Sequence, residues 1–375
     1  MPARRVTSHT IANSEIIFMA DDKLVFRRDA IHAYCRALFE KAGWSPRDAA
    51  ITADHLVAAD LSGHPSHGMG MVPAYVDAIE RGALKPSNTL SEKLRAGALL
   101  VLNGDTALGQ VAGHDATEAA LKIAGEHGIA LVNLIQAHHI GRIGTYAEQA
   151  AAAGMIGLFW VNVVTTRPAV APFGGREKRY GTNPQAIGIP RLGAQPFLLD
   201  FATSRIAVGK TRVAWLAGRK VTFGALLDRD GRPTDDPNVI FPDSTGAVTP
   251  FGEHKGYGLA MVSELLSSIL GGGETIAESR DKETIHNSML AIVIDPAKFA
   301  DIAGDWRARV ERFIGWVKSS APSEGSKEVL APGDPEFRAR AEAGDKVSYD
   351  PGSWTVIADA GRRVGLADAQ IPKPL

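Results

Sequence analysis

The stretch IALVNLIQAHHIGRIGTYAEQAAAAGMIGLFWVNVV, residues 129–164, decides the fold class. Its two ends, 129–135 and 155–164, are continuous apolar runs of the kind that form buried strands. The alanine-rich residues 144–154 between them predict a helix, so the stretch predicts a β-α-β unit and an α/β fold. We expect the loop 136–144 to carry ligand contacts, because a helix that begins after a strand presents free backbone N–H groups.

Composition narrows the class of protein. The chain has 375 residues, 45% of them hydrophobic, which favours two intertwined domains with a sizeable core. A formal net charge of −1, without a basic stripe, argues against nucleic acid and membrane, so we expect small molecules or copies of the chain as partners. No apolar run is long enough for a membrane span or a signal peptide, so the expected location is cytoplasmic. The one cysteine, Cys35, lies in an apolar helical pattern and is expected in the core.

A Ser-His pair lies between two expected helices. Ser45 and Pro46 form a start signal for a helix that runs to Gly63, and another helix follows the segment SGHPSHGMG, residues 62–70. The histidines of this elbow are compatible with a metal clasp, a tight turn or half of an acid/base site. Its proline and glycines break the regular helix that a metal pair would use, and no thiolates or carboxylate cluster complete a ligand set, so we expect no metal.

A second pair of histidines follows the first strand of the quoted stretch. His138 and His139 precede Arg142, the one formal positive charge in that loop. An imidazole beside a cation suits a substrate that has a carboxylate to anchor and an oxygen to protonate. The alternative is a histidine pair that caps the helix or bonds to the backbone, and the residues alone leave both open.

Other segments carry weaker indications. No segment matches the glycine-rich dinucleotide fingerprint or a phosphate-binding P-loop. Lys255 stands at the start of a long helix, 257–270, whose apolar face is expected to be buried. Asp334 and Pro335 mark the start of a helix near the C-terminus.

Seven segments resemble, in their order, those of the malate/L-lactate dehydrogenase family of the non-Rossmann type: SHGMGMVPAYVDAIERG, NGDTALGQVAG, HHIGRIGTYAEQAAAAGMIG, VAPFGGREKRYGTNPQAIGIP, LLDFATSRIAVGK, HKGYGLAMVSELLS and APGDPE. Its relatives include ureidoglycolate, sulfolactate, diketogulonate and Δ1-piperideine-2-carboxylate oxidoreductases. The resemblance covers residues 26–366 and implies an α/β fold in which a non-Rossmann mixed-sheet NAD(P)-binding domain is intertwined with a helical, substrate-binding part. We expect a flexible extension at 1–22, an N-terminal helical part at 23–100 with the Ser-His-Gly motif, a central α/β cofactor- and substrate-binding domain at 101–320, and a C-terminal helical segment at 321–375 that packs back on the N-terminal part.

The resemblance also implies an activity. It implies a homodimeric, NAD(P)-dependent dehydrogenase that moves a hydride between C4 of the nicotinamide and the α-carbon of a 2-hydroxy or 2-oxo acid. Ser66 and His67 match the Ser-His-Gly motif, whose histidine is the proton donor in some members, and His139 matches the acid/base of others. An imidazole with an ordinary pKa near 6.5 exchanges such a proton near neutral pH, and Ser66 is placed to orient it.

Further residues follow from the same resemblance. Tyr75 matches a substrate-contacting position, and Arg142, on charge and position alone, is expected to hold the substrate carboxylate. Segments that resemble nucleotide-contacting ones contain Asn183, Asp200, Thr203, Lys255, Gly333 and Glu336. The acidic sequence GDPE disfavours a 2′-phosphate, so we expect NAD, with NADP as the alternative.

Three departures bear on the substrate. Members of the family often carry arginine where this chain has Ser62, and those that bind dicarboxylates carry arginine where it has Met71, which argues against malate. Lys210 replaces an aspartate of the imine-reducing relatives and favours a hydroxy acid. The alternatives are an NADPH-dependent reductase of a cyclic imino acid, a catalytically silent ligand-binding relative and, last, a metal hydrolase built on the histidines.

Overall fold

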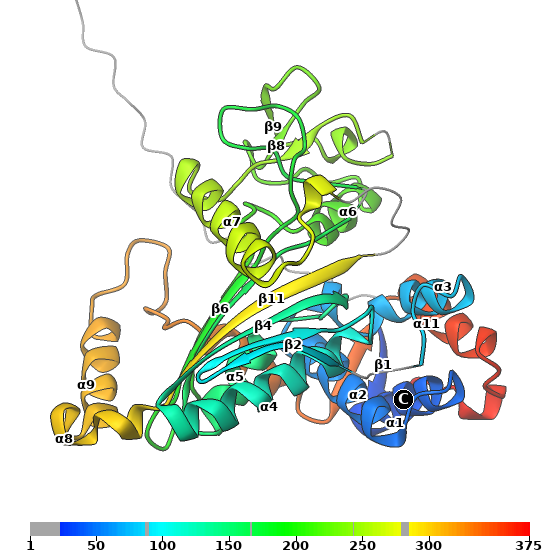
Figure 1. Cartoon of the computed structure of the whole chain (residues 1–375). Coiled ribbons are helices and arrows are strands. Elements are labelled where there is room, and N and C mark those ends of the chain that lie inside the picture. The colour runs from blue at the N-terminus through cyan, green and yellow to red at the C-terminus, as the bar shows by residue number, and fades with distance from the viewer. Residues whose placement is uncertain (1–22, 87–89, 166, 243, 279–284) are drawn as a thin grey trace, which may run out of the picture.

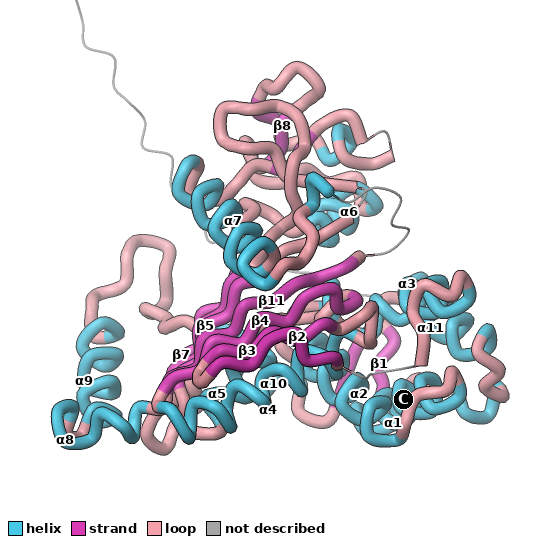
Figure 2. Tube along the Cα trace, in the orientation of Figure 1, coloured by secondary structure: helices cyan, strands magenta, loops and turns pink. Residues whose placement is uncertain are grey.

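The computed structural model describes residues 23–86, 90–165, 167–242, 244–278 and 285–375, so the expected extension 1–22 lies outside the described residues. A twisted sheet crosses the middle of the molecule, and a helical body lies at one end of it (Figure 1). A smaller body of loops, short strands and helices stands above the sheet in the same view (Figure 2).

In the described part of the chain the central sheet is mixed, with seven strands in the order β2-β3-β4-β11-β5-β6-β7. In that order the strands span Ser91–Ala96, Leu99–Asn103, Ile129–His138, His286–Ile294, Ile156–Val161, Gln185–Ile189 and Phe197–Phe201. β3 and β4 are parallel, and the other neighbours are antiparallel. The two strands of the quoted β-α-β stretch, β4 and β5, are separated by β11, which pairs with both. The sheet confirms the expected α/β, non-Rossmann fold class.

Helices cover both faces of the sheet (Figure 1). α4 (Gly109–His127) and α5 (Gly144–Ala152) pack on one face, and α7 (His254–Ser267) lies on the other. α4 turns a row of small side chains toward β4, which lets helix and sheet approach closely: Ala112, Ala116, Ala120 and Ala124.

The helical body joins the two ends of the chain. β1 (Leu24–Arg27) pairs antiparallel with β12 (Lys346–Tyr349). Around this ribbon pack four helices: α1 (Arg28–Lys41), α2 (Pro46–Leu61), α3 (Val72–Glu80) and α11 (Pro351–Arg363). The expected helix start at Ser45 is confirmed, because its side chain accepts the Asp48 N–H at 3.2 Å. Cys35 is fully buried in this core, as predicted.

The smaller body is built on short elements. It contains α6 (Val208–Leu216), β8 (Leu226–Leu227), β9 (Pro233–Thr234) and β10 (Ala247–Val248). Its own apolar cluster includes Tyr180, Leu226 and Val248, and Ala260 of α7 joins it. α7 therefore links this body to the central sheet.

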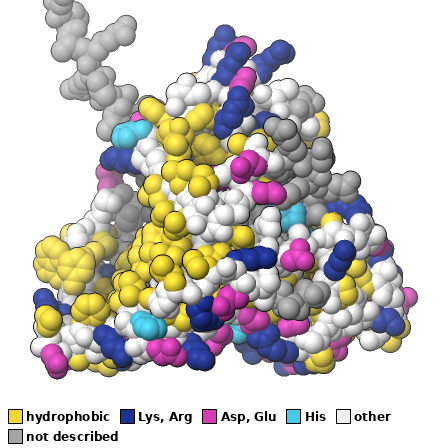
Figure 3. All heavy atoms as spheres, viewed as in Figure 1, with side chains coloured by type: hydrophobic (Ala, Val, Ile, Leu, Met, Phe, Trp, Pro, Cys, Tyr) yellow, Lys and Arg dark blue, Asp and Glu magenta, His cyan; other side chains and the backbone are white. Residues whose placement is uncertain are grey.

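Two helices leave apolar side chains exposed on the single chain. The expectation that the apolar face of 257–270 is buried is wrong here: α7 buries its small residues, and Met261, Leu265 and Leu270 are exposed. α9 (Trp306–Lys318) follows α8 (Ala300–Ala303) in the chain and stands beside it at one side of the molecule (Figure 1), with Phe313 and Trp316 63% and 72% exposed; α10 (Asp334–Ala343) comes next in the chain. Figure 3 shows hydrophobic side chains gathered over both regions. Among the described helices, none is long and apolar enough to cross a membrane.

Candidate active site

An elbow of two short 3-10 turns between α2 and α3 carries His67. This elbow wraps around the carboxylate of Asp60, whose Oδ2 accepts the N–H of Met69 at 3.0 Å and the hydroxyl of Tyr349 at 2.8 Å. A Cβ at Gly68 would collide with the same carboxylate, so the close approach requires glycine there. Burial raises the pKa of Asp60 to about 7. Asp60 thus sets the course of the backbone that presents His67.

Folding brings His67 against His139, at the start of the loop after β4. The two imidazole rings stack with their centroids 5.5 Å apart and an angle of 10° between their planes. α4 begins directly behind His139, because a Cβ at Gly109 would meet the backbone carbonyl oxygens of His138 and His139. Ser66 lies exposed at the elbow, close to Gly209 in the first turn of α6.

His139 is held from behind by two buried polar side chains. The hydroxyl of Tyr75, on α3, lies 2.7 Å from His139 Nδ1. Gln110, in the first turn of α4, donates from Nε2 to that hydroxyl at 2.6 Å. Tyr75 and Gln110 are fully buried, and His139 is 8% exposed. The hydroxyl of Tyr75, expected to contact substrate, is thus engaged by protein atoms, and sequence reasoning had not singled out Gln110.

Burial favours the neutral form of the histidines at the site. Removal from water lowers the pKa of His67 to about 4 and of His138 to about 3, and it lowers the pKa of His139 well below its usual range. The expectation of an ordinary imidazole pKa therefore does not hold for these histidines. Within the described ranges, no group of three or more His, Cys, Asp or Glu side chains could hold a metal.

Arg142 is buried and paired. Its guanidinium lies 3.0 Å from Asp200 on β7 and 2.7 Å from Glu148 on α5, and its side chain is 1% exposed. Its backbone N–H donates to His55 Nε2 at 2.9 Å. Two carboxylates therefore already compensate the positive charge of Arg142, the residue expected from the sequence to hold the substrate carboxylate. The buried Nη2 of Arg142 has no hydrogen-bond partner among the described residues.

A second arginine, Arg340, joins the cluster of charges formed by Arg142, Glu148 and Asp200. Arg340 of α10 pairs with Glu148 through two contacts of 2.6 and 2.7 Å, and its Nε donates to Ser62 Oγ at 2.7 Å. Position 62 lacks an arginine of its own, yet a cation from the C-terminal segment lies beside it. Glu148 bridges Arg142 and Arg340, a role that no sequence pattern indicated.

Three of the expected cofactor residues lie in or near this cluster of charges. Asp200 accepts the N–H of Gly144 at 3.2 Å, and burial raises its pKa against the opposing effect of Arg142. Glu336, in the first turn of α10, lies 3.5 Å from His64 Nε2. Gly333 precedes α10 with a φ of 95°, which favours glycine.

The other three lie around α7. Asn183 is buried, donates to Glu264 of α7 at 2.9 Å and accepts the N–H of Val163 at 3.2 Å. The Thr203 hydroxyl donates to the carbonyl of Thr182 at 2.8 Å. Lys255 is exposed in the first turn of α7. The side chains of Asn183 and Thr203 thus already form hydrogen bonds within the protein, and the Lys255 side chain remains accessible.

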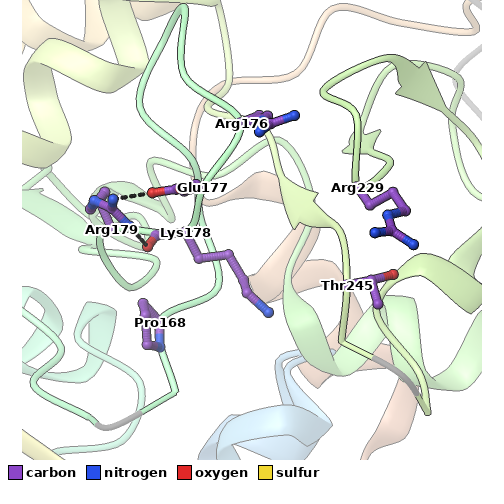
Figure 4. A pocket seen from close by; sticks show the side chains of 7 residues that line it. All are labelled: Pro168, Arg176, Glu177, Lys178, Arg179, Arg229 and Thr245. Atoms are coloured by element: carbon purple, nitrogen blue, oxygen red, sulfur yellow. Dashed lines mark hydrogen bonds and ion pairs between the residues drawn. The ribbon is translucent and has the colours of Figure 1, made fainter.

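A basic hollow of about 340 Å³ lies in the smaller body and contains none of the expected site residues (Figure 4). Lys178 extends into it and donates to Ser244 from 2.6 Å, while Arg179 pairs with Glu177. Its arginine and lysine side chains are thus partly engaged by neighbouring protein atoms.

Known proteins share this fold and sequence. The family model described as malate/L-lactate dehydrogenase matches residues 26–358. Hydroxycarboxylate dehydrogenase B of Escherichia coli K12 is 43% identical over 347 residues, 92% of this chain and 95% of the relative. L-lactate dehydrogenase of Cupriavidus necator is 38% identical over 318 residues, 84% and 90% of the two chains. The solved structure of sulfolactate dehydrogenase from Methanocaldococcus jannaschii aligns with a TM-score of 0.82 at 35% identity, over 92% of this chain and 98% of that one.

The mixed sheet, the paired histidines and these matches define an oxidoreductase of the hydroxy acid dehydrogenase class. The chain belongs to the malate/L-lactate dehydrogenase family.

Proposed function

We propose that the chain is an NAD(P)-dependent 2-hydroxy acid dehydrogenase. The observation that carries the proposal is the stack of two imidazoles, His67 and His139, with the buried guanidinium of Arg142 close enough for its charge to add to the effect of burial in lowering the pKa of His67. The names of the relatives support the reaction class, because each is a dehydrogenase of a hydroxy acid.

The proposed chemistry needs one proton acceptor and one anion anchor. The nicotinamide, when bound, takes up or supplies the hydride. As the hydride leaves the α-carbon, a neutral nitrogen of His67 or His139 accepts the hydroxyl proton, and the resulting imidazolium returns it to the oxo acid in the reverse direction. Ser66, which precedes His67 in the elbow, is the residue proposed to orient the imidazole, and Arg142 is proposed to hold the substrate carboxylate through Nη2, which has no hydrogen bond among the described residues.

The residues present fit a dinucleotide. Lys255 is an exposed cation in the first turn of a 14-residue helix, a combination that suits a phosphate. Ser204, beside Thr203, has a buried hydroxyl without a partner among the described residues and supplies a further donor. Glu336 suits ribose hydroxyls, and its charge disfavours a 2′-phosphate, so we propose NAD rather than NADP.

The substrate is proposed to be a 2-hydroxy monoacid. Met71 is partly buried against the helical core and offers no second cation for a dicarboxylate. Arg340 is the cation nearest to Ser62, and its contacts with Glu148 occupy it. A cyclic imino acid remains the alternative substrate, which the assay below includes.

We also propose a homodimer. The exposed apolar faces of α7 and α9 form a surface that a second copy would cover, since large contiguous apolar patches on a soluble chain mark contact sites. Sedimentation should give twice the chain mass, and Leu265→Glu or Trp316→Glu should yield monomers. Val356→Glu, at an exposed apolar residue of α11, is the control and should leave the mass unchanged. The cytoplasmic location stays a prediction.

The test of the activity is loss of NADH or NADPH absorbance with a panel of 2-oxo acids: pyruvate, oxaloacetate, bulkier monoacids and a cyclic imino acid. Turnover of a monoacid with NADH supports the proposal in full. Turnover of only the cyclic imino acid supports the alternative, and binding of NADH without any turnover indicates a silent relative.

Variants test the site. His67→Ala and His139→Ala should both keep NADH binding, and the true acid/base should lose hydride transfer by roughly a hundredfold or more. His127→Ala, at an exposed residue that ends α4, is the matched control. Full activity in both site variants would refute the assignment.

A further inference from the structure

Gln110 and Tyr75 form a buried chain of hydrogen bonds that ends on one nitrogen of His139. Gln110 Nε2 donates to Tyr75 Oη at 2.6 Å, and Oη lies 2.7 Å from His139 Nδ1. The three side chains come from α4, α3 and the loop after β4, so the chain of bonds depends on the folded structure. Gln110 Oε1 has no partner among the described residues.

The direction of the first bond limits the direction of the second. The single proton of the Tyr75 hydroxyl cannot point at the Gln110 amide nitrogen, because that nitrogen carries hydrogens of its own and acts only as a donor. The Tyr75 hydroxyl is buried between this nitrogen and His139 Nδ1, so Nδ1 is the acceptor that its hydrogen-bonding neighbours offer to its proton. A neutral imidazole with Nδ1 as an acceptor carries its proton on Nε2.

We propose that Gln110 and Tyr75 are positioning residues that hold His139 in the Nε2–H tautomer, so that it acts as a hydrogen-bond donor to the substrate oxygen. This inference rests on the proposed function for the identity of the oxygen, but the tautomer is a property of the protein alone. Held in this way, His139 polarises the carbonyl of an oxo acid and stabilises the charge that develops on it. The proton itself is then moved by His67, whose Nδ1 has no partner among the described residues.

The tautomer can be measured without any substrate. In protein labelled with ¹⁵N-histidine, long-range ¹H–¹⁵N correlations distinguish a protonated ring nitrogen from a bare one. His55 supplies an internal reference of the opposite kind, because its Nε2 accepts the Arg142 N–H and its proton must sit on Nδ1. Signals are assigned by their loss in His139→Ala and His55→Ala.

The expected result is Nε2–H for His139 and Nδ1–H for His55 at pH 7.5. Tyr75→Phe and Gln110→Met should each move His139 to a mixture of tautomers, without an effect on His55. In the active enzyme the same variants should lower kcat about tenfold or more, the value of one hydrogen bond to a reacting group, with little change in KM for NADH. An Nδ1–H tautomer in the unaltered protein would overturn the inference, as would variants that leave the His139 signals unchanged.

The two proposals fail separately. The expected tautomer in a protein that turns over no acid would refute the proposed function and leave the positioning role intact. Turnover of an acid by a protein whose His139 has the Nδ1–H tautomer would support the proposed function and refute the positioning role.

Discussion

Replacement of Asp60 by asparagine should change how the stability of the protein depends on pH. Burial raises the pKa of Asp60 from 3.8 to about 7. Since the folded value lies above the unfolded one, the folded state keeps a proton that the unfolded chain releases, and stability falls as the pH rises through this window. At about 1.4 kcal/mol per pKa unit, Asp60 alone would remove roughly 4 kcal/mol between pH 4 and pH 7.

The assay is urea unfolding at pH 5, 6, 7 and 8 for both proteins. The buried histidines change stability in the opposite sense, because their folded pKa values are lowered and stability is lost as the pH falls. The informative quantity is therefore the difference in unfolding free energy between Asp60→Asn and the original chain, which should shift in favour of the variant by roughly 2–3 kcal/mol from pH 5 to pH 8. Tyr349→Phe removes a bond that lowers the pKa of Asp60, so it should move the window to higher pH. A difference that does not vary with pH would refute the reasoning.

Three further predictions follow from buried groups. Gly109→Ala should destabilise the fold and disturb His139, because the added Cβ would meet two carbonyl oxygens. Gly125→Ala in the same helix is the control and should be neutral or stabilising, because its Cβ would meet only the end of the Met155 side chain. Equal urea midpoints for the two variants would contradict this prediction. Arg142→Met leaves Asp200 and Glu148 without its charge and should lower the free energy of unfolding in urea by about 3–5 kcal/mol. Arg191→Met breaks the more exposed pair with Glu311 and should lower it by about 1 kcal/mol or less. A larger loss for Arg191→Met than for Arg142→Met would be inconsistent with the burial of Arg142. Cys35 is fully buried and burial raises its thiol pKa, so a thiol reagent should react with it only after denaturation, and stoichiometric labelling of the native protein would exclude a core position.

Local patterns predicted local structure well. The N-cap at Ser45, the helix start at Asp334 and the strands and helix of residues 129–164 are set by side chains within a few positions of each other. Strand order depends on pairing across long sequence distances, so nothing in 129–164 indicated that β11, from 286–294, enters between β4 and β5. The apolar stripe of α7 shows the same limit, because periodicity reveals an apolar face and does not say what covers it.

The candidate site was predictable to the extent that its chemistry lies in distinctive residue types. Histidines in glycine-flanked loops drew attention to His67 and His139, and the structure stacks their rings. Gln110 gave no comparable indication, since a glutamine in a first helical turn is ordinary and its role depends on Tyr75 arriving from another helix. Asp60 lay within an expected helix as one more polar residue, and only the return of the chain through Gly68 shows its function.

Charge was the property that sequence described least well. Arg142 is the one cation in its loop, so it looked free to bind an anion, yet Asp200 and Glu148 reach it from other elements. A substrate carboxylate that binds at Arg142 must therefore share this cation with two resident carboxylates, and it adds negative charge beside imidazoles that burial keeps neutral. Because a nearby anion raises the pKa of an imidazole, substrate binding itself would bring His67 closer to the protonation state that reduction requires. The low pKa values that burial gives these imidazoles and an acid/base role at neutral pH are consistent for this reason.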